Sequence, residues 1–249
     1  RVSYGSRSLI GPMANFDPTP GLTSSEAVTS VPRPQGGLAV SIVIANFNGE
    51  RDLPACLESI AALEYPGDLI EPIIVENGSV DGSRALLAET YPWVRVLAQD
   101  TNLGFAPAVN LGAEAATGEL LVLLNNDMQV DPGWLDALVN AYDPDSGYTC
   151  VAGMILDWNG EKVDFAEGVL NWHGMGDQIG FGLPVEHVSV EDGRELLFAC
   201  GGAMLIDRAV YISLGGLDDD YFAYFEDVDL GWRLWLSGHK VRLAKEAIC

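Results

Sequence analysis

An apolar run, Leu-Leu-Val-Leu-Leu at residues 120–124, ends abruptly in Asn125, Asn126 and Asp127. Five consecutive apolar residues are typical of a strand buried on both faces, as in a parallel sheet. In open α/β sheets, ligands bind just beyond the carboxyl ends of such strands. Asp127 is therefore placed where a metal ion or a charged ligand would bind, while the same three residues also suit an ordinary turn.

Strand-like and helix-like segments alternate along the chain from Leu38 onward. The expected strands are residues 40–45, 70–75, 93–97, 119–124 and 150–156, and the helices between them are 52–63, 81–91, 106–116 and 134–142. This order predicts an α/β fold with a mainly parallel, doubly wound central sheet flanked by helices. Later segments predict loops and hairpins over the sheet at 157–195, helices at 207–214 and 227–236, and a short last strand at 240–243.

The chain divides by composition into a tail and a folded body. Residues 1–37 are rich in Pro, Gly, Ser and Thr and predict an extended N-terminal arm or linker. Four apolar residues in it, Leu9, Ile10, Met13 and Phe16, leave docking on the sheet or on another subunit as the alternative. Residues 38–249 predict the folded domain, which reads as stopping in mid-fold at Cys249.

Charge and cysteine usage exclude several classes of protein. The 249 residues carry 36 acidic and 13 basic side chains, a net charge of −23. A nucleic-acid binder needs far more Lys and Arg to neutralise phosphates, so no nucleic-acid partner is expected. No apolar run approaches the length of a transmembrane segment. The four cysteines form no metal or redox motif, so we expect a cytoplasmic protein, either free or peripheral at the inner face of the membrane, with oligomerisation left open.

Polar residues follow each of the first four expected strands. They occupy residues 46–49, 76–79, 100–104 and 125–127. Because parallel strands end at one edge of a sheet, these four segments should meet there. Together they describe a polar crevice that suits a polyhydroxylated, nucleotide-like ligand.

Several of these segments together resemble a known family. The segments are VSIVIANFNG at 40–49, IVENGSVDGS at 74–83, NLGFA at 102–106 with Asn110, LNND at 124–127, GGLD at 215–218 and YFEDVDL at 224–230. In this order they are similar to the family 2 glycosyltransferases, and most of all to the rhamnosyltransferase-type branch. The resemblance covers about residues 38–246. It implies a GT-A fold, a nucleotide-diphosphate sugar donor, a divalent metal (Mg²⁺ or Mn²⁺) and inversion at the anomeric carbon.

The same resemblance implies roles for individual residues. It makes 38–130 the nucleotide-binding half and 131–249 the acceptor and catalytic half, with a saccharide or a lipid-linked saccharide as acceptor. Asp127 becomes the metal ligand, since Asn125 replaces the first Asp of the family's Asp-x-Asp motif. The residues expected to bind the donor are Asn46, Phe47, Glu76, Asn77, Asn102, Gly104, Asn110 and Asn126.

Glu226 and Asp227 directly precede a helical segment. Acidic residues at a helix N-terminus have a simple structural explanation. The functional interpretation makes Asp227 the general base that removes a proton from the acceptor hydroxyl. Glu226 would then hold the acceptor or orient the base. Asp229 is expected to be structural, and residues 218–220 to form a solvated loop.

Some features are missing or open to two interpretations. No basic residue is expected near the four strand ends, so metal and backbone N–H groups would neutralise the diphosphate. The Gln-x-x-Arg-Trp signature of processive synthases is absent, which favours transfer of a single sugar. His239 is expected at the surface, and His173 and His187 are expected to be lone loop histidines rather than metal ligands. Two more features have both a binding and a structural explanation: the aromatic group Trp158, Trp172 and Phe181, and the pair Gly201-Gly202.

Three other functions compete with glycosyl transfer. A sugar nucleotidyltransferase would share the sheet and the metal but need a Gly-rich basic loop, of which residues 49–51 are a poor version. A catalytically silent nucleotide-sugar-binding module would have no use for the acidic pair Glu226-Asp227. A glycosidase would use two carboxylates but not the nucleotide-type loops.

Overall fold

The computed structural model describes residues 37–170 and 175–249. The expected N-terminal arm, apart from Gly37, lies outside the described residues, as do Trp172 and His173.

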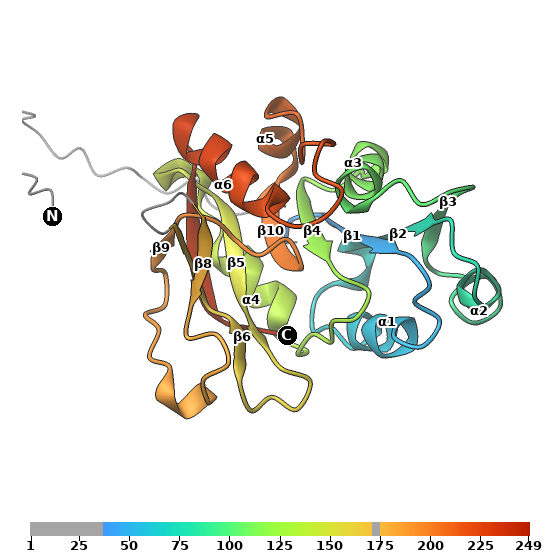
Figure 1. Ribbon diagram of the computed structural model, residues 1–249, viewed down its shortest axis with the longest axis horizontal. Coiled ribbons are helices and arrows are strands. Elements are labelled where there is room, and N and C mark those ends of the chain that lie inside the picture. Colours follow the sequence, from blue (N-terminus) through green and yellow to red (C-terminus); the bar gives the residue numbers. More distant parts are fainter. Residues whose placement is uncertain (1–36, 171–174) are drawn as a thin grey trace, which may run out of the picture. The chain divides into compact units, whose positions relative to one another are not determined.

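A nine-stranded sheet forms the centre of the fold (Figure 1). Its order is β3-β2-β1-β4-β10-β5-β11-β9, with β6 joined to β5. Strands β1 to β4 run parallel to one another, β11 runs parallel to β5, and β10 runs antiparallel to both β4 and β5. The mixed, mainly parallel sheet confirms the predicted fold class. The strands are β1 (Val40–Asn46), β2 (Ile70–Asn77), β3 (Arg95–Gln99), β4 (Leu120–Leu124), β5 (Tyr148–Leu156), β6 (Val163–Phe165), β9 (Glu195–Leu196), β10 (Ala203–Asp207) and β11 (Lys240–Ile248).

Helices cover both faces of this sheet. In Figure 1, α3, α5 and α6 lie above the strands, and α1, α2 and α4 lie below them. Helices therefore pack on both faces of the sheet, as in a doubly wound fold. The helices are α1 (Leu53–Ala61), α2 (Ser83–Thr90), α3 (Phe105–Ala115), α4 (Trp134–Ala141), α5 (Arg208–Ser213) and α6 (Glu226–Leu236), with short 3₁₀ turns η1 (Gly67–Leu69), η2 (Pro144–Ser146) and η3 (Val185–His187).

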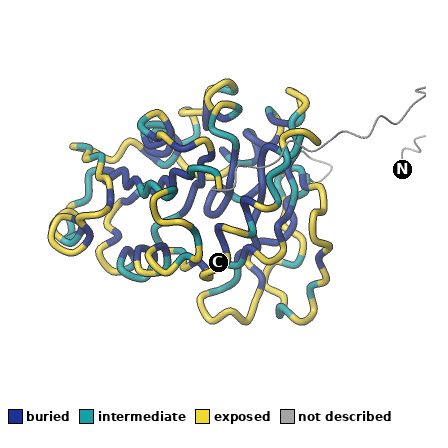
Figure 2. Tube along the Cα trace, turned by 180° about the vertical axis from the view of Figure 1, so that it is seen from behind, coloured by how far each residue is buried: buried dark blue, intermediate teal, exposed yellow. Residues whose placement is uncertain are grey.

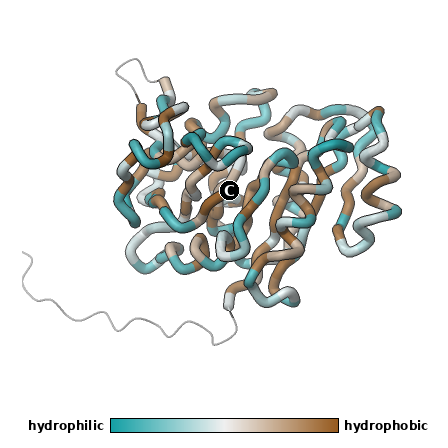
Figure 3. Tube along the Cα trace, turned by 90° about the horizontal axis from the view of Figure 1, so that it is seen from below, coloured by the Kyte–Doolittle hydropathy of each residue, from teal (hydrophilic) through white to brown (hydrophobic). Residues whose placement is uncertain are grey.

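The core lies along the central strands. All five residues of β4 are buried, as the apolar run predicts. Figure 2 shows the central strands buried, and Figure 3 shows hydrophobic residues concentrated along them. Helix α4 adds Trp134, which is fully buried, and packs on β5 and β11. Burying side chains of this size contributes roughly 1.5–3 kcal/mol each.

The order of the strands reverses between β1 and β4. From β1 the chain continues to β2 and β3 on one side, then crosses to β4 on the other. A reversal of this kind opens a crevice at the carboxyl edge, where ligands bind in such sheets. The fold therefore directs attention to the loops after β1 and β4.

Two strands differ from the sequence-based expectation. Strand β10 is not among the expected strands, and it lies antiparallel between β4 and β5, which keeps these two from pairing directly. Strand β11 continues to Ile248, whereas the pattern suggested a short strand ending at residue 243. The exposed residues Lys245 and Glu246 and a shift of register after Leu243 interrupt its apolar pattern.

The described residues between 157 and 195 form hairpins, as predicted. Strand β6 pairs with β5, and β7 (Glu167–Leu170) pairs with β8 (Gly176–Ile179) as a separate antiparallel ribbon. In the described part of the chain, no helix is long and apolar enough to cross a membrane.

Candidate functional site

The ends of β1 and β4 are joined by two side-chain amides. Asn126 Nδ2 donates a hydrogen bond to Asn46 Oδ1 at 2.8 Å, and Asn46 is fully buried. Gly49 permits this pairing, because a Cβ at that position would overlap both amides. The structure thus brings Asn46 and Asn126 together at the reversal of strand order, as the sequence predicts.

The loops after β1 and β2 are also tied together. The Asn48 N–H donates to Ser79 Oγ at 2.9 Å, and the Val80 N–H donates to Asn48 Oδ1 at 2.9 Å. Asn48 has a φ of 54°, in the left-handed region that Asn tolerates better than most residues. Phe47 stands between these anchors with 45% of its surface exposed. Its ring is thus available to a ligand at this edge.

Asn77 and Asn102 shape the loop that leads into α3. Asn77 Nδ2 donates to Asn102 Oδ1 and to the Gly104 carbonyl, both at 3.0 Å, and Asn77 Oδ1 accepts from the Leu103 N–H at 2.9 Å. Gly104 has a φ of 95°, which an L side chain rarely adopts. These residues lie at the carboxyl edge as expected, but their amides brace the loop.

Glu76 and Arg84 form a contact that corrects one expectation. Arg84 Nε pairs with Glu76 Oε2, and Arg84 Nη2 donates to the Gln99 carbonyl. Glu76 Oε1 accepts from the Ser79 N–H at 2.9 Å, and its side chain is fully buried. The expectation that no basic residue lies near the strand ends is therefore wrong. Arg84 lies on α2, eight residues beyond Glu76, and its long side chain returns to the sheet edge.

Asp127 is exposed beyond the end of β4. It makes no hydrogen bond or ion pair within residues 37–170 and 175–249 that would engage its oxygens. The charge of Asp127 adds to burial in raising the pKa of Asp164 on β6, so negative charge concentrates here. No three metal-ligating side chains gather among the described residues. One carboxylate fits an Mg²⁺ or Mn²⁺ ion that also binds phosphates and water, rather than an ion caged by protein alone.

The Gly201-Gly202 turn connects the end of β4 to the acidic pair. The Asn125 N–H donates to the Gly202 carbonyl at 2.9 Å, and the Gly201 N–H donates to Asp227 Oδ2 at 3.0 Å. A Cβ at Gly202 would come within 3.0 Å of the Asn125 side chain. The two glycines therefore hold the candidate metal and base segments close together.

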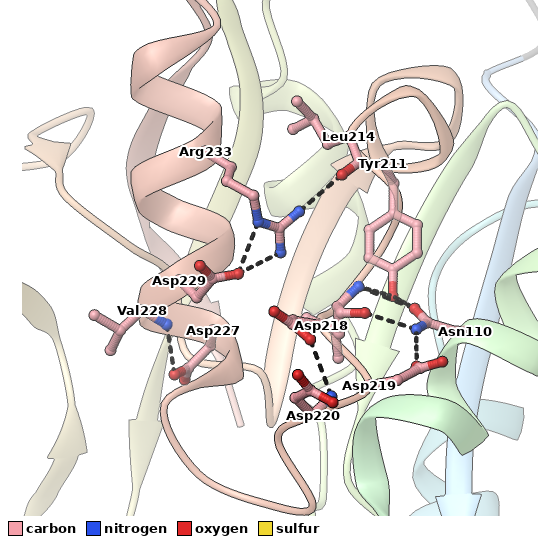
Figure 4. A network of polar contacts seen from close by, with 11 residues as sticks. Asn110, Tyr211, Leu214, Asp218, Asp219, Asp220, Asp227, Val228, Asp229 and Arg233 are labelled. Carbon is pink, nitrogen blue, oxygen red and sulfur yellow. Dashed lines mark hydrogen bonds and ion pairs between the residues drawn. The ribbon is translucent and has the colours of Figure 1, made fainter.

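Asp227 is held by backbone N–H groups at the start of α6 (Figure 4). Its Oδ1 accepts from the Val228 N–H at 2.8 Å, in addition to the bond from Gly201. Burial raises the pKa of Asp227 above the usual aspartate range, while these hydrogen bonds act in the opposite direction. A partly desolvated, oriented carboxylate with a raised pKa is suited to accept a proton.

Glu226 lies beside Asp227 and is only 6% exposed. Its Oε2 is buried and has no hydrogen-bond partner in the described structure. Burial raises the pKa of Glu226, and the charge of Asp227 raises it further. An unpaired buried carboxylate oxygen is costly and needs an explanation. Tyr224 and Phe225, with φ of 74° and 71°, hold the entry to α6 in a strained left-handed conformation.

A cavity of about 690 Å³ opens in front of the acidic pair. Strand β8 and the loop before α6 form its walls, and the Gly201-Gly202 turn and Asn125 contribute to its lining. Its volume fits one or two sugar rings, and aromatic faces are suited to pack against them. Its aromatic lining consists of Phe105, Phe181, Phe198, Tyr224 and Phe225.

Asn110 does not join the strand-end residues. Its Nδ2 donates to the Leu217 carbonyl at 2.7 Å and to Asp219 Oδ1 at 2.8 Å, and its Oδ1 accepts from Tyr211 Oη at 2.6 Å and the Leu217 N–H at 2.9 Å (Figure 4). These four bonds fill the capacity of the amide. The structure therefore gives Asn110 a structural role, not the expected donor contact. A Cβ at Gly216 would overlap Asn110, which explains one glycine of the GGLD motif.

We expect Asn110→Ala to destabilise the fold without weakening nucleotide binding. The substitution removes the acceptor of the buried Tyr211 hydroxyl and leaves the Leu217 N–H with only its longer bond to Tyr211 Oη at 3.2 Å, at a cost of about 1–3 kcal/mol in the free energy of unfolding. Urea unfolding measures this loss, with Asn140→Ala on the exposed face of α4 as the matched control. A folded variant that binds nucleotide much more weakly would restore Asn110 to the donor site.

The remaining candidates separate by exposure. Asp229 pairs with Arg233 at 2.6 Å, in keeping with the expected structural role, and His187 is exposed in η3.

Phe181 lines the cavity, whereas Trp158 is 65% exposed on the β5–β6 turn and does not cover the sheet. Cys200 also lines the cavity, and burial raises the pKa of its thiol to about 12, so it stays protonated.

The polar residues at the carboxyl edge of the sheet have the arrangement of an α/β protein that binds its ligand there. Residues 41–215 match the model of Glycosyl transferase family 2. The chain therefore belongs to glycosyl transferase family 2, in its rhamnosyltransferase-like branch, and is a glycosyltransferase.

Two relatives illustrate the branch. The chain is 31% identical over 222 residues to the N-acetylglucosaminyl-diphospho-decaprenol L-rhamnosyltransferase of Mycobacterium tuberculosis, which covers 79% of this chain and 71% of that protein. It is 32% identical over 218 residues to the O-antigen biosynthesis protein RfbC of Myxococcus xanthus, covering 83% of this chain but 17% of that protein.

Solved structures confirm the GT-A fold. GalNAc-T7 with UDP, GalNAc and Mn²⁺ superposes with a TM-score of 0.69 and 19% identity, covering 84% of this chain and 43% of that one. The mannosyltransferase PcManGT of Pyrobaculum calidifontis, with GDP-Man and Mn²⁺, gives 0.64 and 19%, covering 88% and 58%. The chain thus spans about half the length of these proteins.

Proposed function

We propose that this glycosyltransferase moves one sugar, rhamnose or another hexose, from a nucleotide-diphosphate donor to an acceptor hydroxyl with inversion. The acceptor is a saccharide or a lipid-linked saccharide, as the name of the mycobacterial relative suggests, and the product would enter cell-wall or polysaccharide synthesis. One observation carries the proposal above all. Backbone N–H groups orient both oxygens of Asp227 at the wall of a sugar-sized cavity, and the Gly201-Gly202 turn connects Asp227 to the end of β4.

The reaction follows from these positions. Asp227 takes the proton of the acceptor hydroxyl while that oxygen bonds to the anomeric carbon and the bond to the diphosphate breaks. Each carboxylate oxygen has a second lone pair, so the two backbone bonds leave room for this proton. Glu226 lines the cavity beside Asp227, and its carboxylate would accept a hydrogen bond from a hydroxyl of the acceptor.

The donor occupies the carboxyl edge of the sheet. Asp127 would hold a divalent metal, which when bound offsets the negative charge of the leaving diphosphate. The nucleoside would lie over the ends of β1 and β2, against Phe47 and the loop at Asn102 and Gly104. Asn46, Asn77 and Asn126 keep that surface in place through their hydrogen bonds.

Product analysis with a panel of nucleotide sugars and simple acceptors tests the function. Inverting transfer releases nucleoside diphosphate, and NMR of the new anomeric proton shows a configuration opposite to the donor's. Release of pyrophosphate from a sugar phosphate and a nucleoside triphosphate would instead reveal a nucleotidyltransferase. Donor binding with no product from any acceptor would indicate the silent module.

We expect Glu226→Gln to stabilise the fold at neutral pH while slowing transfer. Burial raises the folded pKa of Glu226 above its unfolded value, so the folded state binds the proton more tightly. The charged form therefore destabilises the fold as pH rises above the unfolded value near ~4.3, and fully so above the folded pKa. Urea unfolding should show the variant as more stable at pH 7, with the difference vanishing below about pH 4. Equal stability of the two proteins at pH 7 would contradict an uncompensated carboxylate at this position.

A further inference from the structure

Arg84 holds a fixed position at the carboxyl edge of the sheet. Its Nε contacts the fully buried carboxylate of Glu76, and its Nη2 contacts the Gln99 carbonyl at the end of β3. Two donors of the planar guanidinium are thus engaged, and the others have no partner in the described part of the chain. The Arg84 side chain remains 46% exposed. A cation fixed on one side and open on the other is arranged to meet a ligand.

The position of Arg84 relative to the candidate metal site suggests which part of the donor it meets. Asp127 follows β4, and Glu76 ends β2, with β1 between these two strands. Two strand spacings separate β4 from β2, about 10 Å. With the diphosphate near Asp127 and the nucleoside over β1, the outer edge of the base reaches the ends of β2 and β3. This step rests on the proposed function.

We propose that Arg84 selects the base of the nucleotide by donating hydrogen bonds to a carbonyl oxygen on its outer edge. The donor would then carry a 4-keto pyrimidine (uracil or thymine) or a 6-keto purine (guanine). Arg pairs in the same way with the carbonyl edge of guanine in DNA. Cytosine and adenine present an amino group at that position, which places donor against donor and leaves a charged group unpaired. Glu76 acts as the positioning residue, since its buried carboxylate orients the guanidinium.

Calorimetric titration of the full chain with UDP, CDP, GDP and ADP in the presence of MnCl₂ tests this proposal. UDP and CDP share the ribose, the diphosphate and the ring size, and differ in the keto or amino group at position 4 and in the proton on the adjacent N3. UDP is compared with CDP if the pyrimidine nucleotides bind more tightly, and GDP with ADP if the purine nucleotides do. In that pair, we expect the keto nucleotide to bind on the order of 10- to 100-fold more tightly than the amino nucleotide, as for a lost hydrogen bond to a charged group.

Two variants separate recognition from folding. Arg84→Lys keeps a charge beside Glu76 but loses the planar fork, so the keto preference should fall to a few-fold while the melting temperature changes little. Arg95→Lys is the matched control. Arg95 is also 46% exposed and also pairs with a glutamate of β2, Glu71, but at the opposite edge of the sheet. Its variant should keep the wild-type preference.

The outcomes distinguish the inference from the function on which it rests. Equal affinity for keto and amino nucleotides, or an undiminished preference in a folded Arg84→Lys variant, would overturn the role of Arg84 and leave glycosyl transfer intact. Failure of every nucleotide to bind, with either Mn²⁺ or Mg²⁺, would overturn the proposed donor and the inference with it.

Discussion

Replacing Asp227 by Asn should reduce turnover by ~10²–10⁴-fold, the usual contribution of a positioned general base. Donor affinity should change little, because Asp227 faces the cavity and would act on the acceptor hydroxyl, not on the nucleotide. The substitution preserves the size of the side chain and removes its basicity. Steady-state kinetics with saturating acceptor give turnover, and calorimetry with the nucleoside diphosphate gives affinity.

A control variant separates loss of the base from loss of charge on α6. Asp229→Asn removes an acidic side chain two residues away, from an ion pair with Arg233. Because this pair is partly buried, its loss should cost about 1.5–3 kcal/mol of stability, with turnover nearly intact. If Asp227→Asn instead abolished donor binding while each bound donor still reacted, Asp227 would be a binding residue and the mechanism would be wrong.

The pH profile offers a second measurement on the same residue. Because burial raises the pKa of Asp227, the base becomes protonated at a pH above the usual aspartate range near ~3.9. The rate of the wild-type enzyme should fall as the pH falls through that raised pKa. This decline at low pH should be absent from the pH–rate profile of Asp227→Asn. A wild-type rate that stayed level down to the ordinary aspartate range would contradict a desolvated base.

Residues close in sequence to a strand end were predictable, because topology alone places them. The apolar run Leu120–Leu124 predicted β4 as a buried strand, and Asp127 lies three residues beyond the end of that strand. Asn46 and Asn126 lie 80 residues apart, yet the rule that parallel strands end at one edge brings them together. The same rule placed Glu76. Local apolar periodicity likewise sufficed for most helices.

Contacts that depend on side-chain direction or on distant loops were not predictable. Asn110 bonds to a loop 107 residues further along, and no local pattern in α3 indicates this partner. Arg84 returns to the end of β2 through a long side chain that composition could not orient. No handedness rule gives the antiparallel direction of β10, because that rule applies to crossovers between parallel strands. In each case the missing information was three-dimensional.

Replacing Asp127 by Ala should weaken metal-dependent donor binding by roughly 100-fold or more, since even a partner outside the ligand shell is worth about 10- to 100-fold in metal affinity. Asp127 is exposed, and its side chain makes no hydrogen bond or ion pair within the described part of the chain, so the fold should be unaffected. Calorimetry with nucleoside diphosphate and Mn²⁺ measures the loss. Asp131→Ala, another exposed carboxylate on the same loop, is the control.

The sign of the effect without metal makes this test more demanding. The chain carries a net charge of −23, and a nucleoside diphosphate is itself an anion. In a chelating buffer, removal of one carboxylate near the phosphates should leave the weak residual affinity unchanged or slightly higher, because it removes repulsion. The two proteins should therefore differ strongly with Mn²⁺ and hardly at all in EDTA. Equal affinities in both buffers would remove Asp127 from the metal site, and a loss in both would make it a direct ligand of the nucleotide.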